Sequence, residues 1–177
     1  MKSSAGNESK EEVRIYDGRV IGVSRRQVTL PDGAELGVEM VRHPGGAAIV
    51  AVDRDHRVCL LRQYRPVIDQ WIWEIPAGKL ETGEPPEETA RRELAEEAGR
   101  EARQWQSLGL MLPTPGFCTE RVHLYRATDL SEVPTAHEPG EVMEIHWLAF
   151  DEAQAMALDG RIEDAKSALA LLRATRP

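Results

Sequence analysis

Residues 78–99 read GKLETGEPPEETARRELAEEAG, and this stretch decides the fold. It places seven glutamates within twenty-two residues. Residues 85–98 are predicted to form a helix, because prolines are tolerated in a first helical turn and Gly99 fits a C-terminal stop. An apolar stripe at i, i+4 and i+8 spacing predicts that one side of this helix packs on a sheet; its members are Ala90, Leu94 and Ala98.

Three of the glutamates share one face of this helix. Glu93, Glu96 and Glu97 stand at i, i+3 and i+4, where each like-charge pair costs a few tenths of a kcal/mol. A hard divalent cation such as Mg²⁺ accepts carboxylate and carbonyl oxygens and keeps waters for substrate phosphates. An ion held by Glu93 and Glu97, with Glu96 serving a second ion or a water, would offset the repulsion.

Salt bridges offer an alternative explanation for the charged helix, in which its surface is simply solvated. The pairs at i,i+4 spacing are Arg91–Glu87, Arg92–Glu88 and Arg92–Glu96. This explanation leaves Glu93 and Glu97 without a designated cation. It also gives no reason for the PAG turn that leads into this stretch.

The order Gly78, Glu84 and residues 92–99 (RELAEEAG) resembles the Nudix box. Arg100 departs from the pattern, because the family usually has a bulky aliphatic residue there, and this affects the packing expected after the helix. The resemblance implies an α/β fold, the Nudix α/β/α sandwich with a mixed β-sheet. It also implies divalent-cation-dependent hydrolysis of a nucleoside diphosphate linked to another moiety.

The same resemblance assigns roles to residues of the box. Glu93 and Glu97 become metal ligands, and Glu96 becomes a further ligand or a catalytic group that orients water. The backbone carbonyl of Ala77, just before the box glycine Gly78, is the usual additional ligand. Arg92 holds the glutamates in place by salt bridges, so it supports the metal ligands without binding the metal itself. Mg²⁺ is the expected ion, and Mn²⁺ is an alternative.

Segments outside the box resemble the ADP-ribose pyrophosphatase branch of this family. Pro115 lies sixteen residues after Gly99, and it is followed by RVHLYRATDL. RQYRPVIDQWIWEIPAG, HPGGAAIVAV and GRIEDAKSALALL resemble the same branch. The likeness implies cleavage of ADP-ribose to AMP and ribose 5-phosphate, an N-terminal antiparallel β extension and a homodimer. A broader nucleoside diphosphate sugar hydrolase remains an alternative.

Two residues are candidates for binding the substrate. Arg65 can hold a phosphate in bidentate fashion, although a surface arginine beside a proline turn is the alternative. Trp73 lies on the same strand face as Trp71 and could stack on adenine, although aromatic residues that alternate along a strand more often belong to a core or an interface.

Three acids outside the helix are candidates for catalysis by resemblance. Glu120 follows Pro115, where this branch often has a functional acid. Glu141 aligns best with a loop glutamate that closes over the substrate as general base or assists the metal, and Glu138 is its alternate. All three could equally be ordinary loop acids.

The rest of the chain predicts one hydrolase domain with an appendage. Residues 1–12 are expected to be a disordered tail, residues 13–42 a β-strand extension that could form a dimer element, and residues 43–177 the Nudix domain. Two apolar runs flank the polar turn DRDHR, residues 53–57, and predict a hairpin with buried faces.

Composition restricts the partners. The net charge of −8, from 22 basic and 30 acidic residues, argues against nucleic acid, whose phosphates require basic side chains. No apolar run approaches the ~18 residues of a membrane helix, and the polar N-terminus is unlike a signal peptide. Two cysteines, Cys59 and Cys118, fit a reduced cytoplasmic protein.

A nucleotide-binding module without turnover is the non-enzymatic alternative to a hydrolase. The complete set of helix glutamates argues against it.

Overall fold

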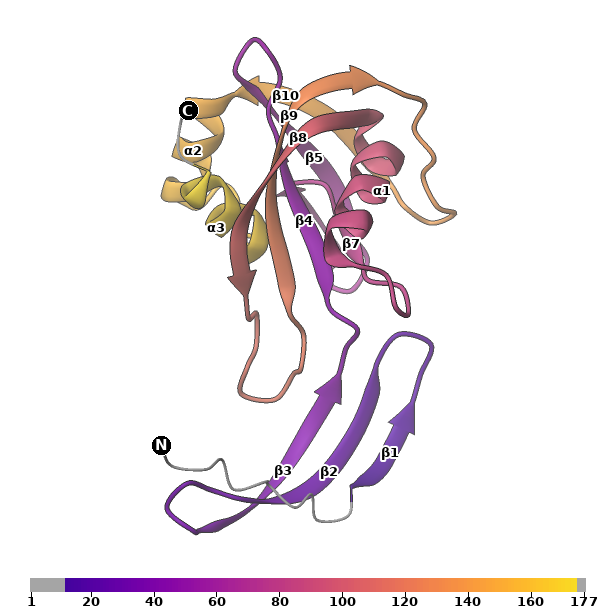
Figure 1. Cartoon of the computed structure of the whole chain (residues 1–177), viewed down its shortest axis with the longest axis vertical. Coiled ribbons are helices and arrows are strands. Elements are labelled where there is room, and N and C mark those ends of the chain that lie inside the picture. The colour runs from indigo at the N-terminus through magenta and orange to yellow at the C-terminus, as the bar shows by residue number, and fades with distance from the viewer. Residues whose placement is uncertain (1–11, 175–177) are drawn as a thin grey trace. The chain divides into compact units, whose positions relative to one another are not determined.

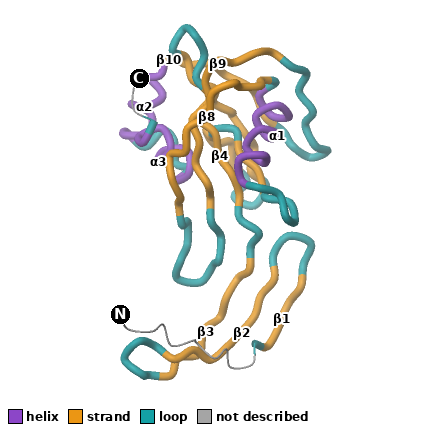
Figure 2. Tube along the Cα trace, in the orientation of Figure 1, coloured by secondary structure: helices purple, strands orange, loops and turns teal. Residues whose placement is uncertain are grey.

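The computed structural model describes residues 12–174 (Figures 1 and 2). The predicted tail over residues 1–12 lies outside the described residues apart from Glu12. The chain divides into two compact units. The N-terminal unit contains the described residues up to Pro44 together with Thr114–Glu120, and the main unit contains Gly45–Pro113 and the chain from Arg121 onward.

The N-terminal unit is an antiparallel sheet in the order β1-β2-β3, as predicted. Its strands are β1 (Val13–Asp17), β2 (Gly22–Thr29) and β3 (Glu35–Arg42). The PDG turn joins β2 to β3, with Gly33 at a positive φ of 86° that favours glycine. The loop Thr114–Glu120 belongs to this unit because the Val41 N–H donates to the Phe117 carbonyl at 2.7 Å.

The main unit is built on two sheets. One has the order β7-β4-β9-β8, in which β4 and β9 run parallel and the other pairs are antiparallel, so it is mixed as predicted. Its strands are β4 (Gly46–Ala51), β7 (Ala77–Lys79), β8 (Arg100–Met111) and β9 (Val122–Glu132). The other has the order β10-β5-β6, with strands β5 (Arg57–Arg65), β6 (Gln70–Glu74) and β10 (Met143–Ala149).

The turn predicted at residues 53–57 is present, but the prediction that the two flanking strands pair as a hairpin is wrong. Val52 and Val58 form a single antiparallel bridge, after which β4 and β5 belong to different sheets. Both strands are buried on both faces. Such strands read as continuous apolar runs, so the sequence did not distinguish a paired hairpin from two strands that diverge into the core.

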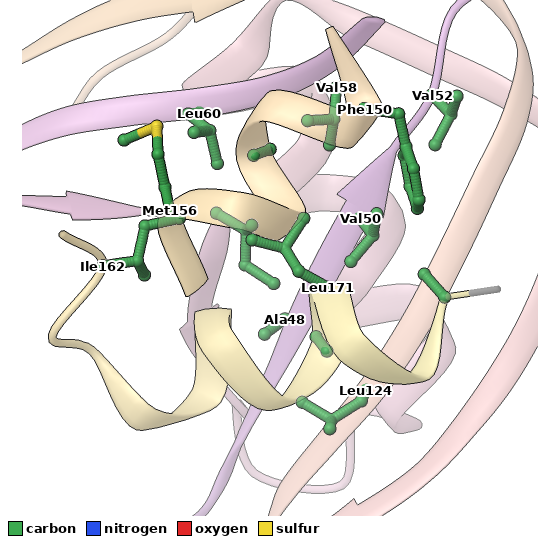
Figure 3. Close-up of a cluster of buried hydrophobic side chains, with 14 of the residues drawn as sticks. Ala48, Val50, Val52, Val58, Leu60, Leu124, Phe150, Met156, Ile162 and Leu171 are labelled. Atoms are coloured by element: carbon green, nitrogen blue, oxygen red, sulfur yellow. The ribbon is translucent and has the colours of Figure 1, made fainter. Parts of the chain in front are cut away.

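Helices cover both faces of the mixed sheet, which confirms the α/β/α sandwich. Alternate residues of β4 enter two separate cores: Ala48 and Val50 join one, and Ala47 and Ile49 join the other. The first core packs under α2 (Phe150–Asp159) and α3 (Ala165–Arg173), as Figure 3 shows for Met156 and Leu171. The second packs under α1 (Pro86–Ala98), on the opposite side of β4 in Figure 1.

Helix α1 follows the sequence prediction closely. Pro85 is its N-cap, and Gly99 ends it in the left-handed conformation with φ of 61°. The predicted stripe of Ala90, Leu94 and Ala98 is buried in the second core. Across residues 12–174 no helix is long and apolar enough to cross a membrane.

Candidate active site

Strand β7, which precedes α1, is hydrogen-bonded to a side chain in the last turn of that helix. The Ala77 N–H donates to Glu97 Oε2 at 2.8 Å. A Cβ at Gly78 would overlap the Glu93 carboxylate, so only glycine allows this approach. The short strand β7 therefore brings its backbone against the two glutamates that stand one helical turn apart.

Both of these glutamates are buried. Glu93 is 8% exposed and Glu97 only 4%. Burial raises the pKa of Glu93 above its ordinary value, despite the nearby positive charge of Arg92. Burial also raises the pKa of Glu97 to about 8; the Ala77 N–H opposes this shift, and the charges of Glu93 and Glu141 add to it. A nearby cation would remove much of the cost of burying these carboxylates.

Arg92 lies among the acids of this stretch. Its Nη1 donates to Glu93 Oε1 at 2.6 Å and to Glu96 Oε2 at 3.0 Å, and its Nε donates to Glu84 Oε1 at 3.2 Å. Glu93, which the i,i+4 pairs of the salt-bridge alternative left without a cation, is thus paired with its neighbour Arg92, whose long side chain folds back to it. Glu97 has no ion pair with Lys, Arg or His among residues 12–174.

The donor set fits a divalent ion. Glu93, Glu96 and Glu97 offer carboxylate oxygens, the ligands that Mg²⁺ and Mn²⁺ prefer, and Glu97 is a buried acid that has no cationic partner within residues 12–174. Within the described part of the chain, no three acidic, His or Cys side chains form a closed metal-binding group. Arg92 Nη1 instead bridges Glu93 and Glu96.

The loop between β9 and β10 is tied to the end of α1. The Ala136 N–H donates to the Glu96 carbonyl at 2.9 Å, and His137 Nε2 lies 3.2 Å from the Glu97 carbonyl. Further along, Glu141 is close enough for its charge to raise the pKa of both Glu93 and Glu97. The Glu141 carboxylate therefore acts electrostatically on both helix glutamates.

Glu138 has a different place in this loop. Its backbone N–H donates to Glu141 Oε2 at 2.8 Å, and its carbonyl accepts from the Glu141 N–H at 3.1 Å. Its side chain is exposed. The backbone of Glu138 thus forms a turn with Glu141 and binds the Glu141 carboxylate.

The two predicted substrate residues have protein partners. Arg65 donates from Nε and Nη2 to the carboxylate of Glu74, at 2.5 and 2.6 Å. The Trp73 ring meets His146 edge-on, with centroids 5.0 Å apart, and the Arg62 guanidinium lies 5.2 Å from its centre. Trp73 also packs against the first core, so it is partly a core residue.

Two further residues singled out in the sequence have partners of their own. Glu120 belongs to the N-terminal unit, where its carboxylate lies 3.5 Å from His43 Nδ1. Arg100, the departure from the box, places its guanidinium 5.3 Å from the centre of the Trp147 ring. Arg100 thus makes a cation–π contact with Trp147 at the position where the family usually has an aliphatic side chain.

A model of the NUDIX domain matches residues 42–171, almost the whole main unit and the helix glutamates with it. The chain belongs to the NUDIX domain family. The methanol dehydrogenase activator of Bacillus methanolicus is 39% identical over 160 residues, which cover 89% of this chain and 86% of that protein. The ADP-ribose pyrophosphatase of Bacillus subtilis (strain 168) is 36% identical over the same shares.

A solved structure supports the NUDIX fold. The crystal structure of an ADP compounds hydrolase superposes with a TM-score of 0.79, covering 98% of this chain and 94% of that one, at 20% sequence identity. The predicted membership of the Nudix family and the likeness to ADP-ribose pyrophosphatases are confirmed.

Sequence reasoning missed several residues around this NUDIX site. Glu74 is a buried acid that holds Arg65, and Lys166 on α3 holds Glu74. The only sequence signal for Glu74 is an acid placed between apolar residues in WIWEIP. His137 had no metal-ligand spacing, and its contact with the end of α1 depends on the fold of a long loop.

Proposed function

We propose that this protein hydrolyses the pyrophosphate bond of ADP-ribose, giving AMP and ribose 5-phosphate, with a divalent metal ion as cofactor. One observation carries the proposal: two buried glutamates, one of which has no cation among the described residues, face the Ala77–Gly78 turn in a NUDIX chain. The curated relative from Bacillus subtilis, named as an ADP-ribose pyrophosphatase, supports the choice of substrate.

Glu93, Glu96, Glu97 and the carbonyl of Ala77 are the residues that we assign to the metal, with Mg²⁺ as the ion and Mn²⁺ as the alternative. The bound ion would neutralise diphosphate charge and lower the pKa of the attacking water. Arg92 would keep Glu93 and Glu96 in place, since its Nη1 already joins them. Gly78 leaves room for the Glu93 carboxylate.

Glu141 is the general base in this proposal. It lies on a loop whose first half is fastened to α1 and whose second half carries a turn closed by Glu138. A carboxylate on such a loop can take a proton from the attacking water once the substrate is in place. Glu138 is the alternate base, and Glu120 remains a candidate acid in the N-terminal unit.

Arg65 is assigned to a phosphate of the substrate, and Trp73 to the adenine ring. Arg65 is held by Glu74 through Nε and Nη2, which leaves Nη1 for another acceptor. In the reaction, the water oxygen bonds to one phosphorus while Glu141 takes one proton, and the bond from that phosphorus to the bridging oxygen breaks. The bridging oxygen leaves on the other phosphate, and the protons of the water pass to the two phosphate monoesters and to solvent.

The protein is proposed to act as a homodimer in the cytoplasm. The N-terminal unit exposes apolar side chains on β1 and in the turn that follows, and such a surface is typical of an interface; they are Val13, Ile15, Tyr16, Val20 and Ile21. Cys59 and Cys118 are free thiols, which persist in a reducing compartment.

The test is product analysis after incubation with ADP-ribose, in Mg²⁺ and in EDTA. Equal amounts of AMP and ribose 5-phosphate in Mg²⁺, and neither in EDTA, would support the proposal. ADP with free ribose, or no product in any divalent ion, would contradict it. If the kcat/KM values for UDP-glucose and GDP-mannose equal the value for ADP-ribose, the result would instead support the broader nucleoside diphosphate sugar hydrolase.

A further inference from the structure

Glu74, at the end of β6, is a buried carboxylate that carries two cations. Its side chain is only 2% exposed. Arg65 binds both of its oxygens, from Nε at 2.5 Å and from Nη2 at 2.6 Å. Lys166 Nζ, on α3, donates to Oε2 as well. One cation suffices to neutralise a buried carboxylate, so the second calls for an explanation.

The two cations differ in how firmly they are held. The Lys166 side chain is 17% exposed, and its Nζ also lies 3.0 Å from Asp164 Oδ1. The Arg65 side chain is 41% exposed. Its contact with Glu74 uses one edge of the guanidinium, and no residue among 12–174 accepts from the remaining Nη1. Lys166 is thus the enclosed cation, and Arg65 presents a free edge.

This network lies beside the candidate active site. Glu74 is followed by Ile75 and Pro76, and then by Ala77, whose N–H binds Glu97. The charge of Glu97 acts on Arg65, and that of Glu74 acts on Glu97. Arg65 is therefore within electrostatic range of Glu97.

The sum of charges explains the second cation. Arg65 and Glu74 alone form a neutral pair, which attracts an incoming diphosphate only weakly. Lys166 gives the trio a net charge of +1. Asp164, whose Oδ1 lies 3.0 Å from Lys166 Nζ, offsets part of this charge. It also caps α3, because its Oδ2 accepts from the N–H and the hydroxyl of Ser167, and the positive end of that helix compensates part of the Asp164 charge in turn.

We propose that Lys166 is a positioning residue that neutralises Glu74, so that Glu74 orients Arg65 while Arg65 keeps its positive charge for the diphosphate of the substrate. The inference rests on the proposed function for the identity of that substrate. It adds a residue from α3, distant in the sequence from the box, that sets the affinity for the diphosphate group.

Ser167 provides a matched control. Its Oγ accepts from the Ile75 N–H at 2.9 Å, so it joins α3 to the residue after Glu74, much as Lys166 joins α3 to Glu74 itself. Ser167→Ala removes a connection between the same two segments without changing any charge, and Asp164 Oδ2, which loses the Ser167 hydroxyl, keeps the hydrogen bond from the Ser167 backbone N–H. A purely structural role for Lys166 predicts that Lys166→Met and Ser167→Ala behave alike.

The experiment measures ADP binding by calorimetry in EDTA, and ADP-ribose kinetics in Mg²⁺, for wild type, Lys166→Met, Lys166→Arg and Ser167→Ala. We expect Lys166→Met to weaken ADP binding about tenfold and to raise KM similarly, with kcat nearly unchanged. Lys166→Arg should restore most of the affinity. Ser167→Ala should lower the melting temperature and leave ADP affinity at the wild-type value.

Glu74→Gln keeps the inference testable where Lys166→Met alone does not fold, because it removes the buried charge. In that background Lys166 keeps only Asp164 as a partner and no longer acts on Arg65 through Glu74, so adding Lys166→Met should change ADP affinity less than about twofold. Unchanged ADP affinity in Lys166→Met, or an equal loss in Ser167→Ala, would overturn the inference. Wild-type protein that binds ADP without cleaving ADP-ribose would refute the proposed function alone.

Discussion

The backbone N–H of Ala77 is hydrogen-bonded to Oε2 of Glu97 at 2.8 Å, which joins the entry to α1 with its last turn. The bond fixes the direction of a carboxylate that has no cation among the described residues. The metal site proposed here depends on this relationship.

Glu97→Gln should weaken metal binding while leaving the fold intact. A glutamine can still accept the Ala77 N–H, but it lacks the charge that a divalent ion requires. Loss of a partner behind the ligands costs 10–100-fold in metal affinity, so loss of this ligand should cost at least about 100-fold. Calorimetric titration with Mn²⁺ measures it.

The same variant has an opposite effect on stability. In EDTA, Glu97→Gln should unfold at an equal or higher urea concentration than wild type, because a neutral amide is less costly to bury than a carboxylate. Glu88→Gln, an exposed site on the same helix, is the control for both measurements. Destabilisation by Glu97→Gln alone would mean that Glu97 has a structural role instead.

Gly78→Ala should reduce hydrolysis strongly. Its Cβ would overlap the Glu93 carboxylate, which must then swing away from Glu97 and from the turn. We expect kcat/KM to fall about 100-fold, as for other displaced metal ligands. Gly22→Ala is the control, because the nearest atom to its new Cβ is 3.6 Å away. Wild-type kinetics in Gly78→Ala would show that Glu93 is not needed in its observed position.

Glu84→Gln removes the ion pair between Glu84 and Arg92, and the pH dependence of stability tests what this pair contributes. The hydrogen bond from Arg92 lowers the pKa of Glu84 from 4.5 to about 2. A lowered folded-state pKa stabilises the protein above pH 4.5, and this stabilisation is lost as pH falls toward 2.

Urea unfolding at pH 7 and pH 3 measures the effect. At pH 7 Glu84→Gln should lower the free energy of unfolding by about 1 kcal/mol, through loss of a partly exposed charged hydrogen bond. The difference from wild type should be smaller at pH 3. A difference that grows on acidification would contradict the assignment.

Ile15→Arg should convert the proposed homodimer to monomer. Ile15 is 58% exposed on β1, and a charge in an apolar interface has a large desolvation cost. Leu158→Arg, at an exposed position on α2, introduces the same side chain elsewhere. Analytical sedimentation measures the oligomeric state of both variants, and we expect Ile15→Arg to be a monomer and Leu158→Arg a dimer. If both variants are monomers, or both are dimers, β1 is not the interface.

Local patterns in the sequence predicted the local structure well. Helix α1, its Gly99 cap and its buried stripe follow from prolines, glycine and spacing that act within a few residues. The alternation of β4 between two cores was also within reach, once an α/β/α arrangement was expected. The box then predicted which face of α1 would carry chemistry.

Long-range pairings were beyond the sequence. Lys166 reaches Glu74 across 92 positions, and nothing in either local pattern indicates this pair. β4 and β5 read as a hairpin because burial on both faces erases the alternation that marks a simple paired strand. The contact of Arg92 with its neighbour Glu93 depends on a side chain folding back, which helical spacing alone does not predict.

The most direct test compares hydrolysis of ADP-ribose in Mg²⁺ by wild type, Glu97→Gln and Glu88→Gln. These two substitutions make the same chemical change on one helix, at a buried and at an exposed position. The account predicts that kcat/KM falls more than about 100-fold in Glu97→Gln and stays within about twofold of wild type in Glu88→Gln. Equal activity of all three proteins would contradict it.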